Sequence, residues 1–404
     1  MALGRSALER PLIATLYALP QLLTKNHTKI PRTLPLQGTC SHPSASTFDH
    51  KTAPRYHPPM PIEAATVQET FKLMQAKLSK LIPDVELRIK AELVYEINRR
   101  KKERGAIILG HNYMEAALYH TVADVVGDSL ELSRKAAETD ADPIIFCGVR
   151  FMAETAKILN PDKTVLLPAK VAGCSLASSI TAEDVRQLKA RYPGVPVVSY
   201  INTYADVKAE SDYICTSGNA ARLVQSINSD TIIFLPDEFL ASNVAQETGK
   251  KIIFPKKEEP APSGPVMIGW RGRCEVHEQF SVEDITSIRK QFPEVQVLAH
   301  PECSPEVVAA SDYSQSTSRM VDFVKKSTAP HFLLLTECSM ADNIIAENPD
   351  KDVLRLCSIR CPHMNEITLE DTLNCLVNNE TVIEVPEDIR VRAKGALERM
   401  LAVR

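Results

Sequence analysis

Two stretches of the chain, which begin at Thr181 and Ser281, have the same pattern. In each, apolar residues first recur at helical spacing among polar ones, and a short continuous apolar run follows. In each stretch a helix-capping hydroxyl precedes acids two and three positions later, and apolar residues then recur at helical spacing. A Pro-containing turn and a short apolar run, which predicts a strand, end at Tyr200 and His300. The two stretches match at an offset of 100 residues, which predicts a repeated unit.

An earlier copy of the unit precedes these two. Residues 106–110 form an apolar run that predicts a strand, and His111 follows it as Tyr200 and His300 follow theirs. An aspartate also lies five residues before a hydroxyl side chain in every copy. The pairs are Asp124 with Ser129, Asp212 with Ser217, and Asp312 with Thr317. We expect each of the three hydroxyl residues to open a helix.

The second half of each unit repeats as well. Apolar strands are predicted at residues 143–146, 231–234 and 331–334, each followed by a helix and a further strand at 165–167, 251–254 or 353–356. Such β-α-β-α-β alternation predicts a parallel sheet covered by helices. We therefore predict an α/β fold of three homologous three-layer parallel-sheet domains around a pseudo-threefold axis. The expected domains are residues 61–180 with preceding helices, 181–280, and 281–404 with C-terminal helices.

One cysteine follows the last predicted strand of every copy: Cys174, Cys274 and Cys361. Seven residues further on, each copy has the same helix cap followed by x-Glu-Asp. Ligands of parallel sheets bind at the carboxyl ends of strands, so the three thiols are expected to meet. Three thiolates are too few for a closed zinc site, but they suit a metal ion with an open position or a 4Fe–4S cluster with one free iron. The alternative is a set of small buried residues in equivalent turns.

Composition narrows the choice of partners. The net charge of −4, with both signs interspersed, and the 5% aromatic content give no reason to expect nucleic acid or a membrane surface as partner. Ten cysteines without an evident secretory signal indicate a reducing compartment, and we expect a cytoplasmic protein. Residues 1–60 are poor in acids and contain many Ser, Thr and Pro, which is typical of a disordered extension or an organelle-targeting segment.

Several short motifs resemble those of the quinolinate synthase family. Their order and spacing agree from about residue 62 to residue 404, and together they are far more specific than any one alone. The matching segments are residues 110–113 (GHNY), 127–129 (GDS), 173–177 (GCSLA), 200–202 (YIN), 215–217 (CTS), 300–302 (HPE) and 316–317 (ST).

The resemblance implies an activity and a cofactor. Members of this family condense iminoaspartate (iminosuccinate) with dihydroxyacetone phosphate to give quinolinate, phosphate and water, which feeds de novo NAD biosynthesis. By resemblance, Cys174, Cys274 and Cys361 hold one 4Fe–4S cluster. The fourth iron is open to substrate and acts as a Lewis acid in dehydration. An L-aspartate oxidase or dehydrogenase that supplies iminoaspartate is the expected protein partner.

The resemblance also assigns residues to the site. Glu302, Tyr113, His111 and His300 are the expected catalytic residues. The expected substrate-binding residues are His111, Ser129, Tyr200, Asn202, Ser217, His300, Glu302 and Thr317.

Alternatives remain open at this stage. Cys357 competes with Cys361 for the third ligand position, and Cys303 lies next to Glu302. His277 follows Cys274 in a C-x-x-H spacing that suggests zinc, although we expect it to support the site or the fold instead. A zinc or Fe(II) lyase, and a non-enzymatic binding protein, are the competing functions. Brown colour and acid-labile sulfide distinguish the cluster from the single-ion lyase, and a binding protein would bind a dicarboxylate without turnover.

Overall fold

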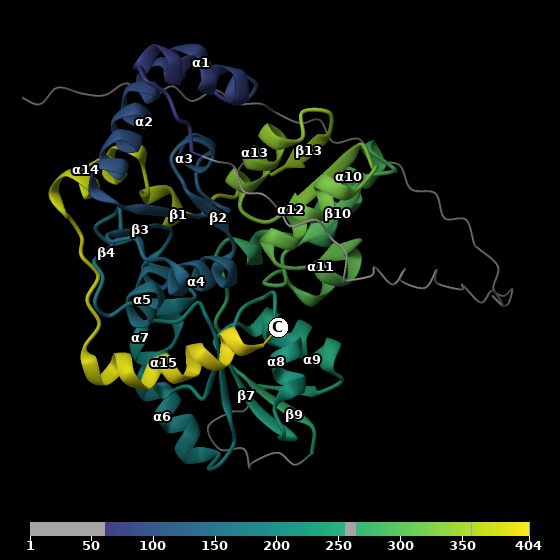
Figure 1. Cartoon of the computed structure of the whole chain (residues 1–404). Coiled ribbons are helices and arrows are strands. Elements are labelled where there is room, and N and C mark those ends of the chain that lie inside the picture. Colours follow the sequence, from purple (N-terminus) through teal and green to yellow (C-terminus); the bar gives the residue numbers. More distant parts are fainter. Residues whose placement is uncertain (1–60, 255–263, 357, 404) are drawn as a thin grey trace, which may run out of the picture. The chain divides into compact units, whose positions relative to one another are not determined.

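The computed structural model describes residues 61–254, 264–356 and 358–403, shown in Figure 1. The expectations for residues 1–60 and for Cys357 fall outside these ranges. Two helices precede the first repeat, α1 (Val67–Leu78) and α2 (Asp84–Arg104). α2 ends at Gly105, whose φ of 63° is the left-handed conformation that glycine adopts without strain.

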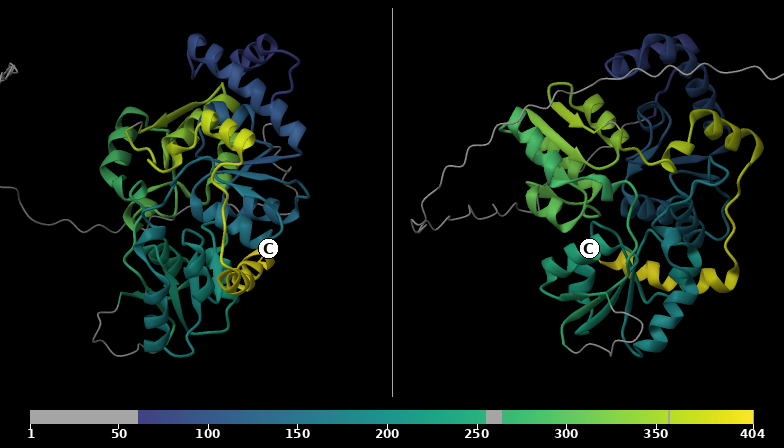
Figure 2. Two further views of the ribbon diagram at one scale, coloured as in Figure 1. Left: turned by 90° about the vertical axis from the view of Figure 1, so that its left-hand side faces the viewer. Right: turned by 180° about the vertical axis from the view of Figure 1, so that it is seen from behind.

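Each repeat forms one parallel sheet flanked by helices, which confirms the predicted fold class (Figures 1 and 2). The elements of repeat 1 are β1 (Ile107–His111), α3 (Ala116–Thr121), β2 (Val125–Gly127), α4 (Ser129–Glu138), β3 (Ile144–Cys147), α5 (Arg150–Leu159) and β4 (Val165–Leu166). Those of repeat 2 are α6 (Ala182–Arg191), β5 (Val197–Tyr200), α7 (Ala205–Glu210), β6 (Tyr213–Cys215), α8 (Ala220–Ser226), β7 (Thr231–Leu235), α9 (Glu238–Thr248), β8 (Lys251–Ile253) and β9 (Val266–Gly269). Those of repeat 3 are α10 (Val282–Gln291), β10 (Gln296–Ala299), α11 (Pro305–Ala310), β11 (Tyr313–Ser314), α12 (Thr317–Lys326), β12 (His331–Leu335), α13 (Cys338–Glu347) and β13 (Asp352–Arg355).

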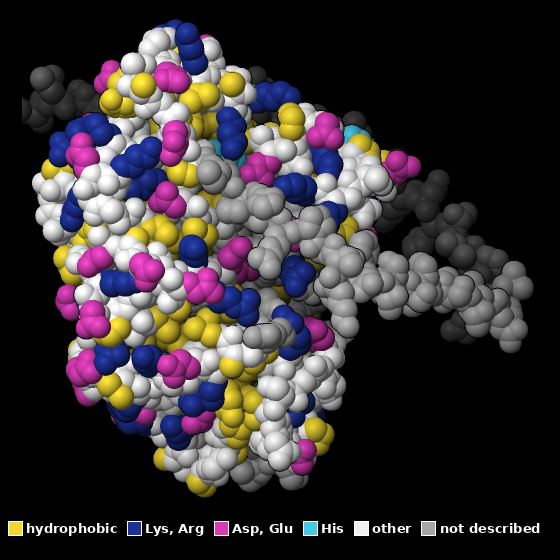
Figure 3. Space-filling model, in the orientation of Figure 1, with side chains coloured by type: hydrophobic (Ala, Val, Ile, Leu, Met, Phe, Trp, Pro, Cys, Tyr) yellow, Lys and Arg dark blue, Asp and Glu magenta, His cyan; other side chains and the backbone are white. Residues whose placement is uncertain are grey.

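The first four positions of the three sheets follow one strand order, and the second sheet has a fifth strand at its edge. The order is β2-β1-β3-β4 in repeat 1, β6-β5-β7-β9-β8 in repeat 2 and β11-β10-β12-β13 in repeat 3. The central strands β3, β7 and β12 are apolar and almost wholly buried, as expected where helices cover both faces of a sheet. The side chains on the face shown in Figure 3 mix both signs of charge. None of the described helices is long and apolar enough to cross a membrane.

Three local expectations need correction. The short strands β2, β6 and β11 were not predicted, and neither was β9, so repeats 1 and 3 have one strand more than the pattern indicated and repeat 2 has two more. The predicted strand at 251–254 is β8 at the sheet edge, and β9 occupies the place beside β7. Ser129 and Thr317 open helices as expected, but Ser217 lies in a turn, because α8 begins only after its cap Asn219.

The repeated aspartates join the first two strands of every sheet. Asp124, Asp212 and Asp312 each accept a hydrogen bond at 2.8 Å from the backbone N–H at the start of the neighbouring strand. Their own backbone N–H groups donate to the carbonyl oxygen of the same neighbouring residue at 2.9 to 3.0 Å. The aspartate that recurs in each repeat therefore pairs the first two strands of its sheet. The predicted caps Thr181 and Ser281 both form complete capping boxes.

The C-terminal part of the chain packs on repeats 1 and 2. Helix α14 (Leu369–Asn378) lies against α2 and β3, and α15 (Glu387–Ala402) lies against α7 and β6 (Figures 1 and 2). Between the two helices, Leu167 donates its N–H to Thr381, and Ile383 donates to Val165. This segment therefore covers the edge strand β4 of the first sheet.

Replacing Asp212 tests the strand-pairing role of the aspartates. In Asp212→Ala the N–H of Val197 loses its side-chain acceptor, which should lower the free energy of unfolding by roughly 1–3 kcal/mol. Asp212→Asn keeps an acceptor oxygen and should lose much less. Chemical unfolding of the two variants side by side is the measurement, and equal losses would contradict the assignment.

Candidate active site

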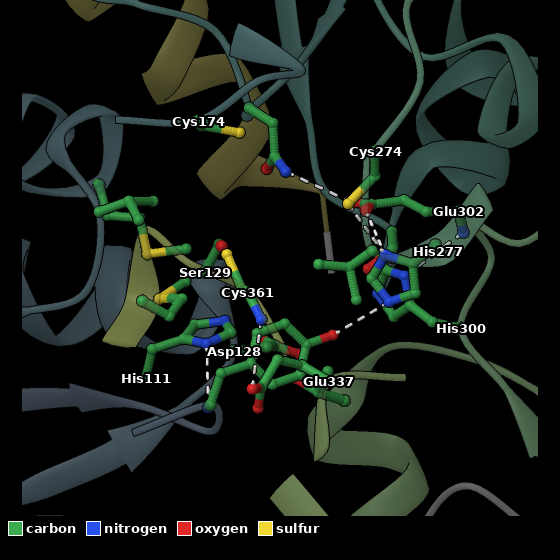
Figure 4. Close-up of a pocket in the computed structure, with 18 of the residues that line it drawn as sticks. His111, Asp128, Ser129, Cys174, Cys274, His277, His300, Glu302, Glu337 and Cys361 are labelled. Atoms are coloured by element: carbon green, nitrogen blue, oxygen red, sulfur yellow. Dashed lines mark hydrogen bonds and ion pairs between the residues drawn. The ribbon is translucent and has the colours of Figure 1, made fainter. Parts of the chain in front are cut away.

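A cavity that is partly open to solvent lies where strand ends from the three sheets meet, and the space in it and at its mouth measures about 650 Å³. All twelve residues that the sequence analysis assigned to the site line it, and Figure 4 shows several of them facing one another across the cavity. They are His111, Tyr113, Ser129, Cys174, Tyr200, Asn202, Ser217, Cys274, His300, Glu302, Thr317 and Cys361.

Three equivalent loops carry half of these side chains. Each loop follows one strand, β1, β5 or β10. Two residues at each strand end, separated by one other residue, line the cavity. The pairs are His111 with Tyr113, Tyr200 with Asn202, and His300 with Glu302.

In each loop a single side-chain nitrogen donates hydrogen bonds to two backbone carbonyl oxygens. The Asn343 side chain donates to the carbonyl oxygens of Asn112 and Met114 at 3.1 and 2.9 Å. Asn243 donates in the same way to Pro301 and Cys303 at 2.9 and 3.0 Å. In the second loop the Lys208 ammonium takes this place and donates to Ile201 and Thr203. One residue lies between the two bonded carbonyls of each loop, and its side chain points into the cavity. These residues are Tyr113, Asn202 and Glu302.

The two histidines at the strand ends are neutral hydrogen-bond donors. Burial lowers the pKa of both His111 and His300 to about 3. Nδ1 of His111 accepts the backbone N–H of Tyr113 at 3.2 Å, and Nδ1 of His300 accepts that of Glu302 at 3.3 Å. A neutral ring that accepts at Nδ1 carries its proton on Nε2. Both rings can therefore donate to an oxygen of a bound molecule.

Glu302 is held as a carboxylate. Burial alone would raise its pKa, but the neighbouring His277, together with His300 and the Tyr200 hydroxyl, lowers it below its usual range. Oε1 accepts from the Tyr200 hydroxyl at 2.5 Å and from Asn202 at 3.3 Å, and Oε2 lies 2.8 Å from Nδ1 of His277. Burial, and then the charge of Glu302, raises the pKa of Tyr200, so its phenol stays protonated.

His277 lines the cavity itself and contacts Glu302 directly. Its Nε2 is 3.0 Å from the Thr336 hydroxyl, which lies 2.6 Å from the Tyr113 hydroxyl. A hydrogen-bonded chain therefore runs from Glu302 through His277 and Thr336 to Tyr113. The C-x-x-H spacing was the only sequence signal for His277, and nothing marked Thr336. Glu337, Asp128 and several apolar residues also line the cavity and were not predicted to do so.

The three cysteines occupy equivalent turns. The carbonyl oxygen of each accepts the backbone N–H four residues later, at 3.0 to 3.2 Å. Backbone N–H groups of the second and third following residues act on each sulfur and favour the thiolate. Burial nevertheless raises the pKa to about 12 for Cys174 and about 11 for Cys361, and well above the usual value for Cys274.

Such sulfurs fit metal ligands better than nucleophiles. The amide groups suit a thiolate, yet the burial demands a positive partner, and a metal centre supplies one. Thiolates that bind different irons of a cluster stand farther apart than ligands of a single ion, which suits cysteines from three repeats. Cys303, by contrast, lies in the core, where its thiol donates to the carbonyl oxygen of Leu335.

Three parallel-sheet repeats that each bring one cysteine to a shared pocket form an α/β protein whose site suits a metal centre. The family model described as "Quinolinate synthetase A protein" matches residues 95–402. The chain therefore belongs to the quinolinate synthase family, a family of iron–sulfur-dependent enzymes.

Relatives named quinolinate synthase match most of the chain. "Quinolinate synthase 2" of Mesorhizobium japonicum is 49% identical over 339 residues, which is 84% of this chain and 100% of the relative. "Quinolinate synthase" of Sinorhizobium fredii is 47% identical over 344 residues, 85% of this chain and 91% of the relative. The enzyme of the same name from Xylella fastidiosa is 49% identical over 312 residues, 77% of this chain and 86% of the relative.

Replacing Asn343 tests whether the loop nitrogens position the site. Asn343→Ala leaves two buried carbonyls without a donor, at about 1–3 kcal/mol each, and frees the loop that carries His111 and Tyr113. Misplacement by about 1 Å should lower kcat on the order of 10²-fold.

Asn348→Ala is the matched control. Asn348 is a buried residue at the end of the same helix, and it donates to the carbonyl oxygen of Ile344. This variant should lose stability but keep its turnover. Equal turnover in the two variants would show that Asn343 serves only the fold.

Proposed function

We propose that the chain condenses iminoaspartate with dihydroxyacetone phosphate to form quinolinate, with release of phosphate and water, in NAD biosynthesis. The observation that carries the proposal is the convergence of three equivalent cysteines and polar side chains from three repeats on one cavity. Membership of the quinolinate synthase family supports the same reaction.

Cys174, Cys274 and Cys361 are the proposed ligands of one 4Fe–4S cluster, which leaves the fourth iron open to substrate. The cluster, when bound, supplies a Lewis-acidic iron for loss of a hydroxyl group. The boundaries of the three domains, at residues 61–180, 181–280 and 281–404, belong to this proposal. So do a cytoplasmic location and an L-aspartate oxidase or dehydrogenase as the supplier of iminoaspartate.

Glu302 is the proposed general base. Its carboxylate lies in the cavity, ionised, with one oxygen fixed by Tyr200 and Asn202 and the other beside His277. Removal of a proton from the carbon next to a departing hydroxyl requires such a group. The chain of His277 and Thr336 links it to the Tyr113 phenol, which is the proposed proton donor at the far end.

The remaining polar residues are proposed to bind substrate. His111 and His300 donate hydrogen bonds through Nε2 without adding positive charge. Ser129 and Thr317 are the first residues of α4 and α12, and each offers a hydroxyl to a carboxylate or phosphate. The side chain of the cap residue Ser316 accepts no N–H of α12, so the start of α12 suits an anion. At α4 the Asp128 carboxylate already accepts the N–H groups of Leu130 and Glu131, so there the hydroxyl of Ser129 is the proposed donor. Ser217 offers a hydroxyl from the turn before α8, and Tyr200 and Asn202 complete the set.

Serine substitutions test the cluster ligands. Serine at position 174, 274 or 361 should abolish retention of iron and acid-labile sulfide after anaerobic purification, because each removes a thiolate from a different iron. Cys303→Ser and Cys375→Ser are the matched controls, since both thiols are buried and donate to backbone carbonyls, and both variants should stay brown. Full iron and activity in Cys361→Ser would contradict the assignment and point to Cys357. A colourless wild-type protein that contains zinc and still turns over substrate would favour a single-ion lyase.

Glu302→Gln tests the base. The amide keeps the shape of the side chain but cannot accept the proton, so turnover should fall on the order of 10²–10⁴-fold. Iron and sulfide content and the optical spectrum should match those of the wild type, which separates a lost base from a lost cofactor. Turnover within tenfold of the wild type, with an intact spectrum, would assign the base elsewhere.

A further inference from the structure

Cys274, His277 and Glu302 form a compact set of donors that the proposed cluster site does not fully use. Their donor atoms all lie within 4.8 Å of one another. Nδ1 of His277 is 2.8 Å from Oε2 of Glu302 and 3.2 Å from Sγ of Cys274. All three residues line the cavity, and the side chains of His277 and Glu302 are only 3% and 4% exposed.

The other polar atoms of the set already have partners outside it. Nε2 of His277 faces the Thr336 hydroxyl, and Oε1 of Glu302 accepts from Tyr200 and Asn202. What remains at the centre is a nitrogen, a sulfur and an oxygen that face one another. Their lone pairs repel one another unless a proton or a cation lies between them.

The donor types and their spacing fit a single transition-metal ion. Thiolate, imidazole and carboxylate are the three ligand types of protein-bound zinc. Bonds of about 2.0–2.3 Å to a tetrahedral ion place ligand atoms roughly 3.3–3.8 Å apart. Here the nitrogen lies 2.8 Å from the oxygen and 3.2 Å from the sulfur, so these atoms must separate by roughly half an ångström to admit an ion. Partners such as Thr336 and Tyr200, which orient the ligands from behind, are also typical of metal sites.

We propose that the cluster-free protein binds one divalent ion of the zinc type at Cys274, His277 and Glu302, with the fourth position open to the cavity. The ion and the cluster share Cys274 and therefore exclude each other; this second part rests on the proposed function. The ion also coordinates Glu302, the proposed base, and its partner His277, so neither residue is then available for proton transfer. Ion-loaded protein is consequently inactive and resists cluster assembly.

The test is a metal titration of a Cys174→Ser/Cys361→Ser protein. This variant lacks two proposed cluster ligands but retains the whole ion site. Stripped with a chelator under anaerobic conditions, it should bind one Co²⁺ per chain, with the visible bands of tetrahedral Co²⁺ and a thiolate-to-cobalt charge-transfer band. Zn²⁺ should displace the Co²⁺ and remove both signals.

His277→Gln in the same background should weaken binding by more than about 100-fold, since loss of a ligand's outer partner alone costs about 10–100-fold. His331→Gln is the matched control, because His331 is 31% exposed and paired with Asp352 away from the cavity, and it should change nothing. If the double variant fails to fold, as judged by circular dichroism, the single Cys174→Ser and Cys361→Ser proteins carry the same test.

Two results would overturn the proposal. Binding by stripped wild-type protein but not by the serine variants means that the three thiolates hold the ion. Lack of binding by all of them means that the three donors share only a proton. Neither result depends on catalysis, so failure here is distinguishable from failure of the proposed function. As a further expected result, zinc-loaded wild-type protein stays colourless on incubation with Fe²⁺ and sulfide until a chelator removes the zinc.

Discussion

A single nitrogen that binds two carbonyl oxygens shapes each of the loops on which the site depends. A strand that has just left its sheet has backbone carbonyls without ladder partners, and in a buried place these must be satisfied. Asn343 of the third repeat binds the loop of the first, and Asn243 of the second repeat binds the loop of the third, so these contacts also fasten repeats together. In the first and third loops the same hydrogen bonds therefore position the site and hold two repeats together, whereas Lys208 holds the loop of its own repeat.

The charge balance of the cavity follows from that backbone arrangement. Glu302 is the ionised acid, stabilised by His277 and two further donors, whereas His111 and His300 are kept neutral by burial. The two neutral rings offer directed hydrogen bonds without adding positive charge. In the proposed reaction such bonds hold anionic substrates in place, with the reacting carbon within reach of the Glu302 carboxylate.

The repeat, the parallel sheets and the meeting of the site residues in one cavity could be predicted from the sequence. The 100-residue match places equivalent residues at equivalent strand ends, and this was enough for the prediction. The sequence was insufficient for strands as short as Val125–Gly127, which contain too few residues to show a period. Thr336 gave no signal because the other repeats have Gly148 and Pro236 at its position. Lys208 was missed for a similar reason, since it replaces an asparagine that comes from a different helix in the other repeats.

The return of residues 369–402 to the first two repeats has a consequence for biosynthesis. The chain emerges from the ribosome with its N-terminal part first, but the outer strand of the first sheet gains its cover only when residues 381–383 arrive. Until then β4 is an open edge, and α2 lacks the helix that shields it. An open edge is the place where partly made chains join one another, so the nascent protein depends most on chaperone protection until its last helices have been made.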